Sequence, residues 1–277
     1  MTFHPVFSAP FACRAADCRH SCCKGWEIDV DEAALRRYAA VKGELGYDLR
    51  RSIYQDDDGA HFLLTEDERC PFLQPDGLCR LICELGEVAL CEICAQHPRF
   101  YVSFCTEHFG ECEFCGYGLS CEAACDLLLG ETQELRVVSD ETGKVMTVPV
   151  LLGLPAEMLR FDGTLPADAY LQRMAGTEQI DEAWPEELKR LRAGLRDLET
   201  LPTGVRYDRI AQYLLLRQLD RAGETPLERL IAYARDSTAF IAAQDALFGT
   251  DAEHLRRWSE QIEYSTENVD ILLGNQT

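Results

Sequence analysis

Apolar residues in the second half of the chain recur every three or four positions, which is the spacing of an amphipathic helix. A first stripe follows Trp184-Pro185 and consists of Leu188, Leu191, Leu195 and Leu198. Residues 207–222 are apolar over so much of the helical circumference that they predict a central helix. The pattern therefore predicts a bundle of helices in this half.

Two further helix starts resemble a capping box, in which a side-chain oxygen and a glutamate three residues later satisfy free backbone amides. Thr225 precedes Pro226 and Glu228, and Thr250 precedes Glu253. We therefore predict N-caps at Thr225 and at Thr250. The apolar stripe continues after them at Leu227, Leu230, Ile231, Ala234, Leu255, Trp258 and Ile262.

The first half alternates short elements with turns. Asp29 and Asp31 are candidate N-caps for a helix that carries Leu35 and Tyr38, and a second helical stretch is expected near 45–54. Residues 60–65 predict a short strand. Two apolar runs within 134–150 flank Asp140-Glu141-Thr142-Gly143, which predicts a β-hairpin. Between residues 79 and 125 the cysteines recur too often for a period to be read.

These patterns predict a mainly α protein. We expect a loop-rich, cysteine-ligated metal module at 1–130, packed on a helical domain at 131–277, with one β-hairpin between them. The alternative is that both parts form one continuous unit.

All fourteen cysteines lie in the first 125 residues. Residues 1–10 lack the basic and apolar regions of a signal peptide, and no stretch has the roughly 18 apolar residues of a membrane helix. We therefore expect a soluble cytoplasmic protein without a membrane partner. Because the cytosol is reducing, its thiols are better explained as metal ligands or redox groups than as disulfides.

The net charge of −21 disfavours nucleic acid and anionic lipid as partners, because neither meets a basic surface here. A cationic partner, such as a lysine side chain on another protein, is easier to accommodate. The alternative is that the acidic residues only keep the protein in solution.

Two kinds of metal centre fit the cysteines. Cys91-x2-Cys94 and Cys112-x2-Cys115 flank residues 95–111, a spacing typical of a four-cysteine zinc site. Iron–sulfur clusters also take four thiolates, so spacing alone leaves both metals open. The C-x3-C-x2-C triplet of radical chemistry is absent, since Gly25 stands where its third cysteine would be.

Four stretches resemble the flagellin lysine-N-methylase family. The matching residues are Cys13 to Trp26, including Cys22-Cys23-Lys24-Gly25-Trp26; Cys70-Pro71-Phe72-Leu73 through Leu85-Gly86-Glu87; Cys94 with Pro98-Arg99 and Gly118-Leu119-Ser120-Cys121; and Trp258 to Ser265 with Glu267-Asn268. The cysteine motifs are shared with other metal-chelating proteins, whereas the C-terminal stretch is more particular. The resemblance spans both ends of the chain and covers the middle loosely.

The resemblance implies methyl transfer from S-adenosylmethionine to lysines of flagellin, with a cysteine-bound iron–sulfur cluster of the 4Fe-4S kind. Its ligands would be drawn from Cys13, Cys18, Cys22, Cys23, Cys70, Cys79, Cys94 and Cys121. His97 departs from the family, which more usually has tyrosine there. Six cysteines are extra and suggest a second metal centre or a changed ligand set: Cys83, Cys91, Cys105, Cys112, Cys115 and Cys125.

Methylation requires a neutral lysine amine, so the enzyme must remove the ammonium proton by desolvation or by a proton acceptor. The polar residues of the matching C-terminal stretch are the catalytic candidates: Glu263, Tyr264, Glu267 and Asn268. The competing interpretation places the two glutamates on a solvated helix face and Tyr264 in the core. Arg99 is a candidate for binding the carboxylate of S-adenosylmethionine, or it pairs with a surface acid.

Two other functions stay open at this point. The chain could be a non-enzymatic iron- or zinc-chelating or electron-transfer protein, or a zinc-stapled interaction module. The metal content and the binding of S-adenosylmethionine distinguish these functions from a methyltransferase.

Overall fold

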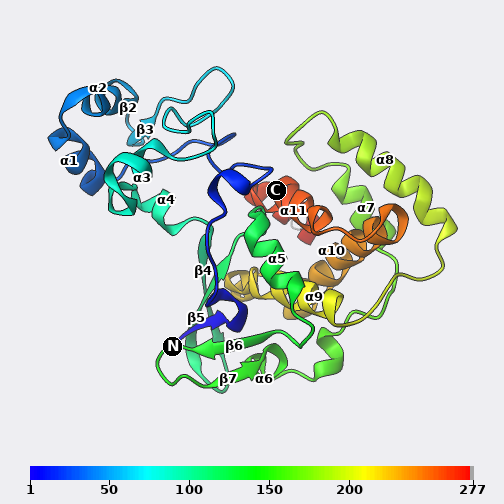
Figure 1. The fold of residues 1–277 in the computed structure, drawn as a ribbon. Coiled ribbons are helices and arrows are strands. Elements are labelled where there is room, and N and C mark those ends of the chain that lie inside the picture. Colours follow the sequence, from blue (N-terminus) through cyan, green and yellow to red (C-terminus); the bar gives the residue numbers. More distant parts are fainter. Residues whose placement is uncertain (275–277) are drawn as a thin grey trace. The chain divides into compact units, whose positions relative to one another are not determined.

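The computed structural model describes residues 1–274 and divides the chain into two compact units (Figure 1). The cysteine unit is Ala12–Pro98, and the main unit combines Met1–Phe11 with Arg99–Thr277. The predicted boundary at residue 130 lies inside the main unit, between a helix and a strand. That residues 1–130 form one module stays a prediction.

The cysteine unit contains four short helices and one two-stranded sheet. Its helices are α1 (Glu32–Ala40), α2 (Gly43–Arg51), α3 (Arg80–Leu85) and α4 (Glu92–Gln96), and its strands are β2 (Ile53–Gln55) and β3 (Ala60–Phe62). Asp31 caps α1, as predicted, because its carboxylate accepts a hydrogen bond from the Ala34 amide at 2.8 Å. The predicted strand at 60–65 is confirmed by β3.

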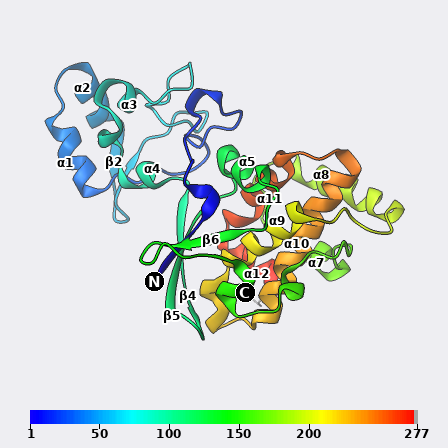
Figure 2. The same cartoon turned by 60° about the horizontal axis from the view of Figure 1, so that its bottom comes forward.

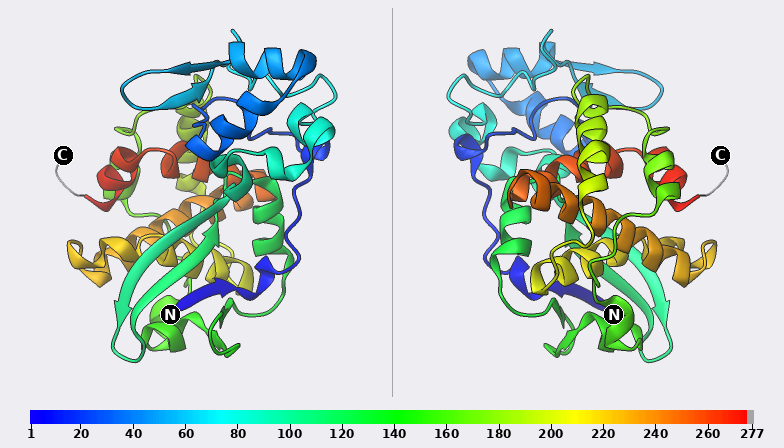
Figure 3. Two further views of the ribbon diagram at one scale, coloured as in Figure 1. Left: turned by 90° about the vertical axis from the view of Figure 1, so that its left-hand side faces the viewer. Right: turned by 90° about the vertical axis from the view of Figure 1, so that its right-hand side faces the viewer.

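A five-stranded sheet organises the main unit, in the order β4-β5-β1-β6-β7. Its strands are β1 (Thr2–Pro5), β4 (Arg99–Thr106), β5 (Gly110–Tyr117), β6 (Arg136–Ser139) and β7 (Val145–Thr147). The predicted hairpin at 134–150 is confirmed by β6 and β7. Strand β1 lies between β5 and β6, parallel to the former and antiparallel to the latter (Figure 3).

The longest strand pair, β4 with β5, was not predicted (Figure 2). In β4, Val102 and Phe104 are buried, whereas the residues between and beside them are exposed. This alternation is the sign of a half-buried strand, but it occupies the cysteine-dense stretch in which no period was read. The sheet is therefore larger than the single hairpin that the sequence predicts.

Eight helices of the main unit follow or flank this sheet. They are α5 (Glu122–Gly130), α6 (Val148–Leu152), α7 (Asp168–Met174), α8 (Trp184–Gly194), α9 (Val205–Leu216), α10 (Leu227–Phe248), α11 (Ala252–Glu263) and α12 (Thr266–Leu273). The mainly α prediction is confirmed. Helix α9 is central, as predicted, and its Tyr213 contacts the rings of Phe100 and Phe114 in the sheet.

Both predicted capping boxes differ from the observed helix starts. Helix α10 begins after Pro226, whose extended backbone leaves Thr225 outside the helix, where the Thr225 amide closes the preceding turn on Arg221. Helix α11 is capped by Asp251 instead of Thr250, because the Asp251 carboxylate accepts a hydrogen bond from the Glu253 amide at 2.9 Å. The predicted caps were each one residue too early.

Within residues 1–274, no helix has both the length and the apolar character that crossing a membrane requires.

Candidate metal centre

Five cysteines of the cysteine unit gather in its core, brought there by different segments of backbone. Their residues are Cys23, Cys70, Cys79, Cys91 and Cys94, all of which belong to or pack against one apolar cluster. The Cys70 amide donates a hydrogen bond to the Cys23 carbonyl at 2.8 Å, next to the bridge between Lys24 and Arg69. Cys79 stands at the N-cap of α3 and Cys91 at the N-cap of α4.

The pKa of each of several of these thiols depends on its burial and on the neighbouring cysteines. Burial and the neighbouring Cys23, Cys79 and Cys91 raise the pKa of Cys70 to about 12. A hydrogen bond with Cys22 lowers the pKa of Cys23 to about 7. The hydrogen bond between Cys91 and Cys94 lowers the pKa of Cys91 and raises that of Cys94. Thiolates that raise each other's pKa are the groups that a metal cation stabilises.

The other predicted ligands lie differently. Cys13 and Cys22 are exposed, and Cys18 is half-buried. Cys121 belongs to the main unit, where it is the N-cap residue of α5. Of the predicted set, the structure therefore brings together Cys23, Cys70, Cys79 and Cys94, with exposed Cys22 in a hydrogen bond with Cys23. It adds Cys91, which the resemblance did not include among the ligands.

The two C-x2-C pairs have different geometries, although their spacing is the same. Cys91 and Cys94 lie on the first turn of α4 and share a hydrogen bond. Cys112 and Cys115 lie in the regular strand β5, where residues three apart point to opposite faces of the sheet. Cys112 and Cys115 therefore do not both face one ion.

Trp26 and His97, at two ends of the cysteine unit's sequence, lie against each other. Their rings stack with centroids 6.1 Å apart, and the Trp26 indole donates a hydrogen bond to the Cys22 carbonyl. Burial lowers the pKa of His97. The His97 ring is thus packed against Trp26.

Of the four catalytic candidates, two are buried and two are exposed. The Glu263 side chain is 2% exposed, pairs with Arg217 and accepts a hydrogen bond from Ser259. Asn268 is also buried, whereas Glu267 and Tyr264 are exposed, the latter at 57%. The competing interpretation had Glu263 solvated and Tyr264 buried, and the structure reverses both positions.

The polar contacts of Asn268 and Glu267 lie within the protein. The Asn268 side chain accepts a hydrogen bond from the Glu178 amide and donates hydrogen bonds to the carbonyls of Glu178 and Gln261. Hydrogen bonds from its own backbone amide, Ser265 and Thr266 lower the pKa of Glu267. Glu267 therefore stabilises the start of α12, and Asn268 ties α12 to Glu178 and to Gln261 on α11. That the four residues act in catalysis stays a prediction.

Arg99, the candidate for the carboxylate of S-adenosylmethionine, is the first residue of β4. It is exposed, and its guanidinium lies 5.6 Å from the centre of the Tyr117 ring. An exposed guanidinium on a strand can bind a carboxylate, and the cation–π contact limits its movement.

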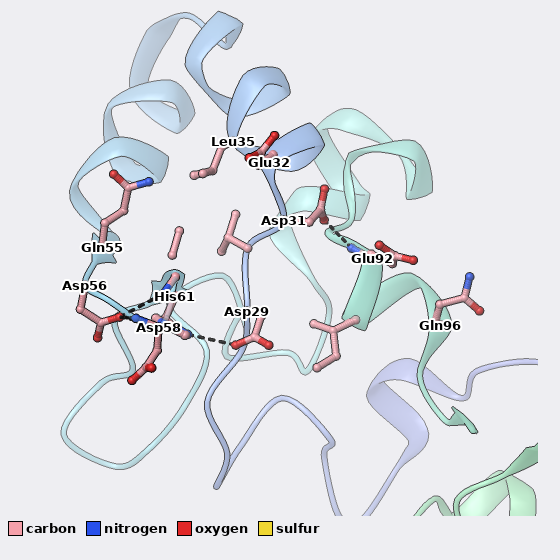
Figure 4. A pocket seen from close by; sticks show the side chains of 14 residues that line it. Asp29, Asp31, Glu32, Leu35, Gln55, Asp56, Asp58, His61, Glu92 and Gln96 are labelled. Carbon is pink, nitrogen blue, oxygen red and sulfur yellow. Dashed lines mark hydrogen bonds and ion pairs between the residues drawn. The ribbon is translucent and has the colours of Figure 1, made fainter. Parts of the chain in front are cut away.

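The cysteine unit also holds an acidic cavity of about 800 Å³ that sequence reasoning missed (Figure 4). Its lining includes six carboxylates and no lysine or arginine: Asp29, Asp31, Glu32, Asp56, Asp58 and Glu92. The imidazole of His61 lines the same cavity and is 4% exposed. The sequence did not predict that these residues lie together, because Asp29 and His61 are far apart in the chain and are paired only by an antiparallel bridge.

Comparison with known proteins adds a sequence relationship to this geometry. The lysine-N-methylase of Salmonella typhimurium is 32% identical over 117 residues, which is 37% of this chain and 27% of that protein. The lysine-N-methylase of Salmonella choleraesuis matches to the same extent. The flagellar biosynthetic protein FliU of Salmonella muenchen is 32% identical over 113 residues, or 37% of this chain and 64% of that protein.

The similarity covers only part of each sequence: 37% of this chain and about a quarter of each of the two lysine-N-methylases. No protein-family model and no solved structure matches the chain. The matches nevertheless agree with one another in name and in extent. They show that part of this chain is similar in sequence to proteins named lysine-N-methylase and FliU.

Proposed function

We propose that this chain is, or is part of, a protein-lysine N-methyltransferase that uses S-adenosylmethionine and a cysteine-bound iron–sulfur cluster. The observation that carries the proposal is the group of five mutually interacting thiols in the core of the cysteine unit. The names of the relatives supply the reaction, and lysine on flagellin or another protein is the proposed substrate.

A set of four thiolates suits an iron–sulfur cluster and also a single zinc ion. The resemblance to the lysine-N-methylases is what favours the cluster in this proposal. Cys23, Cys70, Cys79 and Cys94 would hold the cluster, with Cys91 as the alternative to one of them.

When bound, the cluster supplies iron that either cross-links the loops or exchanges electrons, and S-adenosylmethionine supplies the methyl group. The protein's own residues must bind the lysine and remove a proton from its ammonium, because the protonated nitrogen has no lone pair. The acidic surface attracts the lysine as a cation, in accord with the net charge of −21. Exposed Tyr264 and Glu267 are better placed for a proton acceptor than Asn268, whose amide is fully used within the fold.

The test is visible absorption with iron, sulfide and zinc analysis on protein purified without oxygen. We expect brown protein with matched iron and sulfide, and loss of both in Cys70→Ser and Cys94→Ser. Cys105→Ser is the matched control, because Cys105 is exposed and lies in β4, outside the group of five. Colourless protein that contains zinc would overturn the cluster and favour a zinc-stapled module.

The methyl-transfer reaction needs a separate assay. Protein that carries the cluster is incubated with S-adenosylmethionine labelled in its methyl group and with flagellin. Label in the flagellin lysines, absent when Cys70→Ser protein is used, is the expected result. Cluster-loaded protein that binds no S-adenosylmethionine would contradict the enzyme and favour an electron-transfer role.

A further inference from the structure

We infer that Glu27, Asp29 and His61 form a second metal site, at the acidic cavity that Asp29 and His61 line, and that it binds a divalent cation of the Mn²⁺ or Fe²⁺ type. This inference concerns no cysteine and does not rest on the proposed methyl transfer. It rests on the distances between the three ligand atoms, on the paired backbone that holds them, and on a buried imidazole nitrogen without a hydrogen-bond partner within residues 1–274.

The three ligand atoms converge. The Nδ1 atom of His61 lies 3.0 Å from Asp29 Oδ1 and 3.1 Å from Glu27 Oε1. Ligand bonds of about 2.0–2.2 Å from one cation place neighbouring ligand atoms at such separations. One imidazole with two carboxylates suits manganese or iron, since soft thiolate ligands are absent from the group.

Paired backbone holds the ligands in place. Asp29 and His61 are opposite each other in an antiparallel bridge, closed by hydrogen bonds from Val30 to Ala60 and from Phe62 to Ile28. On its other side His61 pairs with Tyr54 in β2. The Tyr54 hydroxyl donates a hydrogen bond of 2.7 Å to Glu27 Oε2, which leaves Oε1 directed at the imidazole.

The second nitrogen of His61 is an independent sign that the buried imidazole is incompletely partnered in the protein alone. His61 Nε2 is buried and has no hydrogen-bond partner among the described residues, although Asp56 Oδ1 lies 3.5 Å away. Histidines that bind a metal through one nitrogen usually direct the N–H of the other at a carboxylate. A cation on Nδ1 fixes the proton on Nε2, facing Asp56, and so satisfies both nitrogens.

The negative charge around His61 also favours a bound cation. Three carboxylates, Glu27, Asp29 and Asp56, surround one imidazole, so the group stays negative even when the imidazole is protonated. The cavity lining offers no lysine or arginine to compensate this charge. Two positive charges from an ion would neutralise most of it.

The experiment titrates Mn²⁺ into the full chain and follows free Mn²⁺ by electron paramagnetic resonance. Wild-type protein should bind one Mn²⁺ with micromolar affinity, and Glu27→Gln and Asp29→Asn should each weaken it at least about tenfold. Asp58→Asn is the control, because Asp58 lines the same cavity without contacting His61; its affinity should change less than about threefold. Cys94→Ser should bind Mn²⁺ like the wild type.

Two results would overturn the site. One is the absence of Mn²⁺ binding by folded wild-type protein at millimolar concentration. The other is equal weakening by Asp29→Asn and Asp58→Asn, which indicates a diffuse acidic surface. Tyr54→Phe is a further control, because it removes the hydrogen bond to Glu27 but keeps all three ligands. It should weaken Mn²⁺ binding only several-fold. In proton NMR, the imidazole signal of His61 is identified as the one that is absent from His61→Gln. Added Mn²⁺ should broaden this signal of the wild type at a lower concentration than the signals of the other histidines.

Discussion

Asn268 is the residue whose predicted role and observed contacts differ most. Its side-chain amide accepts a hydrogen bond from the Glu178 amide and donates to the carbonyls of Glu178 and Gln261. With 1% of its surface exposed, it joins the segment before α8 to the last turn of α11 and to its own helix α12. These contacts give a structural reason for an asparagine here.

We expect Asn268→Ala to lower the free energy of unfolding by about 2–4 kcal/mol, because it leaves buried backbone groups without partners. Urea denaturation followed by circular dichroism measures the change. Gln179→Ala is the control, since Gln179 is exposed in the adjacent segment, and should cost less than about 0.5 kcal/mol. A fully stable Asn268→Ala protein that has lost methyl transfer would show instead that the residue acts in catalysis.

At the scale of elements, Asp245 joins three helices of the main unit. Its buried carboxylate, on α10, accepts hydrogen bonds from Tyr207 on α9 and contacts Arg206 and His254. Burial alone would raise the pKa of Asp245, but the hydrogen bond to His254 and the charge of Arg206 outweigh it and lower the pKa below its ordinary value. The ionised form is therefore favoured by folding.

Asp245→Asn should cost about 3 kcal/mol at pH 7, because it leaves Arg206 without its buried partner. A lowered folded-state pKa gives stability that is present above the unfolded value of about 3.9 and is lost as the pH falls through the folded value. The difference between wild type and variant should thus shrink below pH 4, as measured by urea midpoints. Glu228→Gln, exposed on the same helix, is the control. Parallel pH dependences of wild type and Asp245→Asn would contradict this account.

Elements with local signals were predictable, and those defined by distant partners were not. The cap at Asp31, the hairpin of β6 and β7 and the buried α9 depend on neighbouring residues and follow from pattern and turn chemistry. Strand β4 has a readable alternation at Phe100, Val102 and Phe104, which the surrounding cysteines obscured. The site at Asp29 and His61 depends on a bridge between residues far apart in sequence, for which a single sequence has no sign.

That the eight predicted cysteines bind a metal stays a prediction, and four of them, Cys23, Cys70, Cys79 and Cys94, belong to or pack against the apolar cluster of the cysteine unit. Spacing failed for Cys112 and Cys115, because the same C-x2-C interval aligns thiols on a helical turn and separates them on a strand. Choosing among cysteines therefore required their secondary structure.

At the scale of the whole molecule, the cysteine unit is inserted between β1 and β4 of the main unit. We expect a fragment of residues 12–98 to fold and to retain iron, because its thiols and their apolar cluster are contained within it. A fragment of residues 1–130 should be less stable and prone to association, since β1 would lack β6 and expose an edge. Circular dichroism and iron analysis of both fragments measure this, and a stable, monomeric 1–130 fragment with an unfolded 12–98 fragment would contradict it.

The place of β1 in the sheet also fixes an order of assembly during synthesis. Thr2 pairs with Glu113 and Phe3 with Ser139, so the first strand waits for partners that the ribosome makes more than a hundred residues later. At about 5–20 residues per second, the delay is roughly 6–22 s for Glu113 and roughly 7–27 s for Ser139, and the whole cysteine unit is synthesised within that time. Folding of the nascent cysteine unit can therefore precede closure of the sheet.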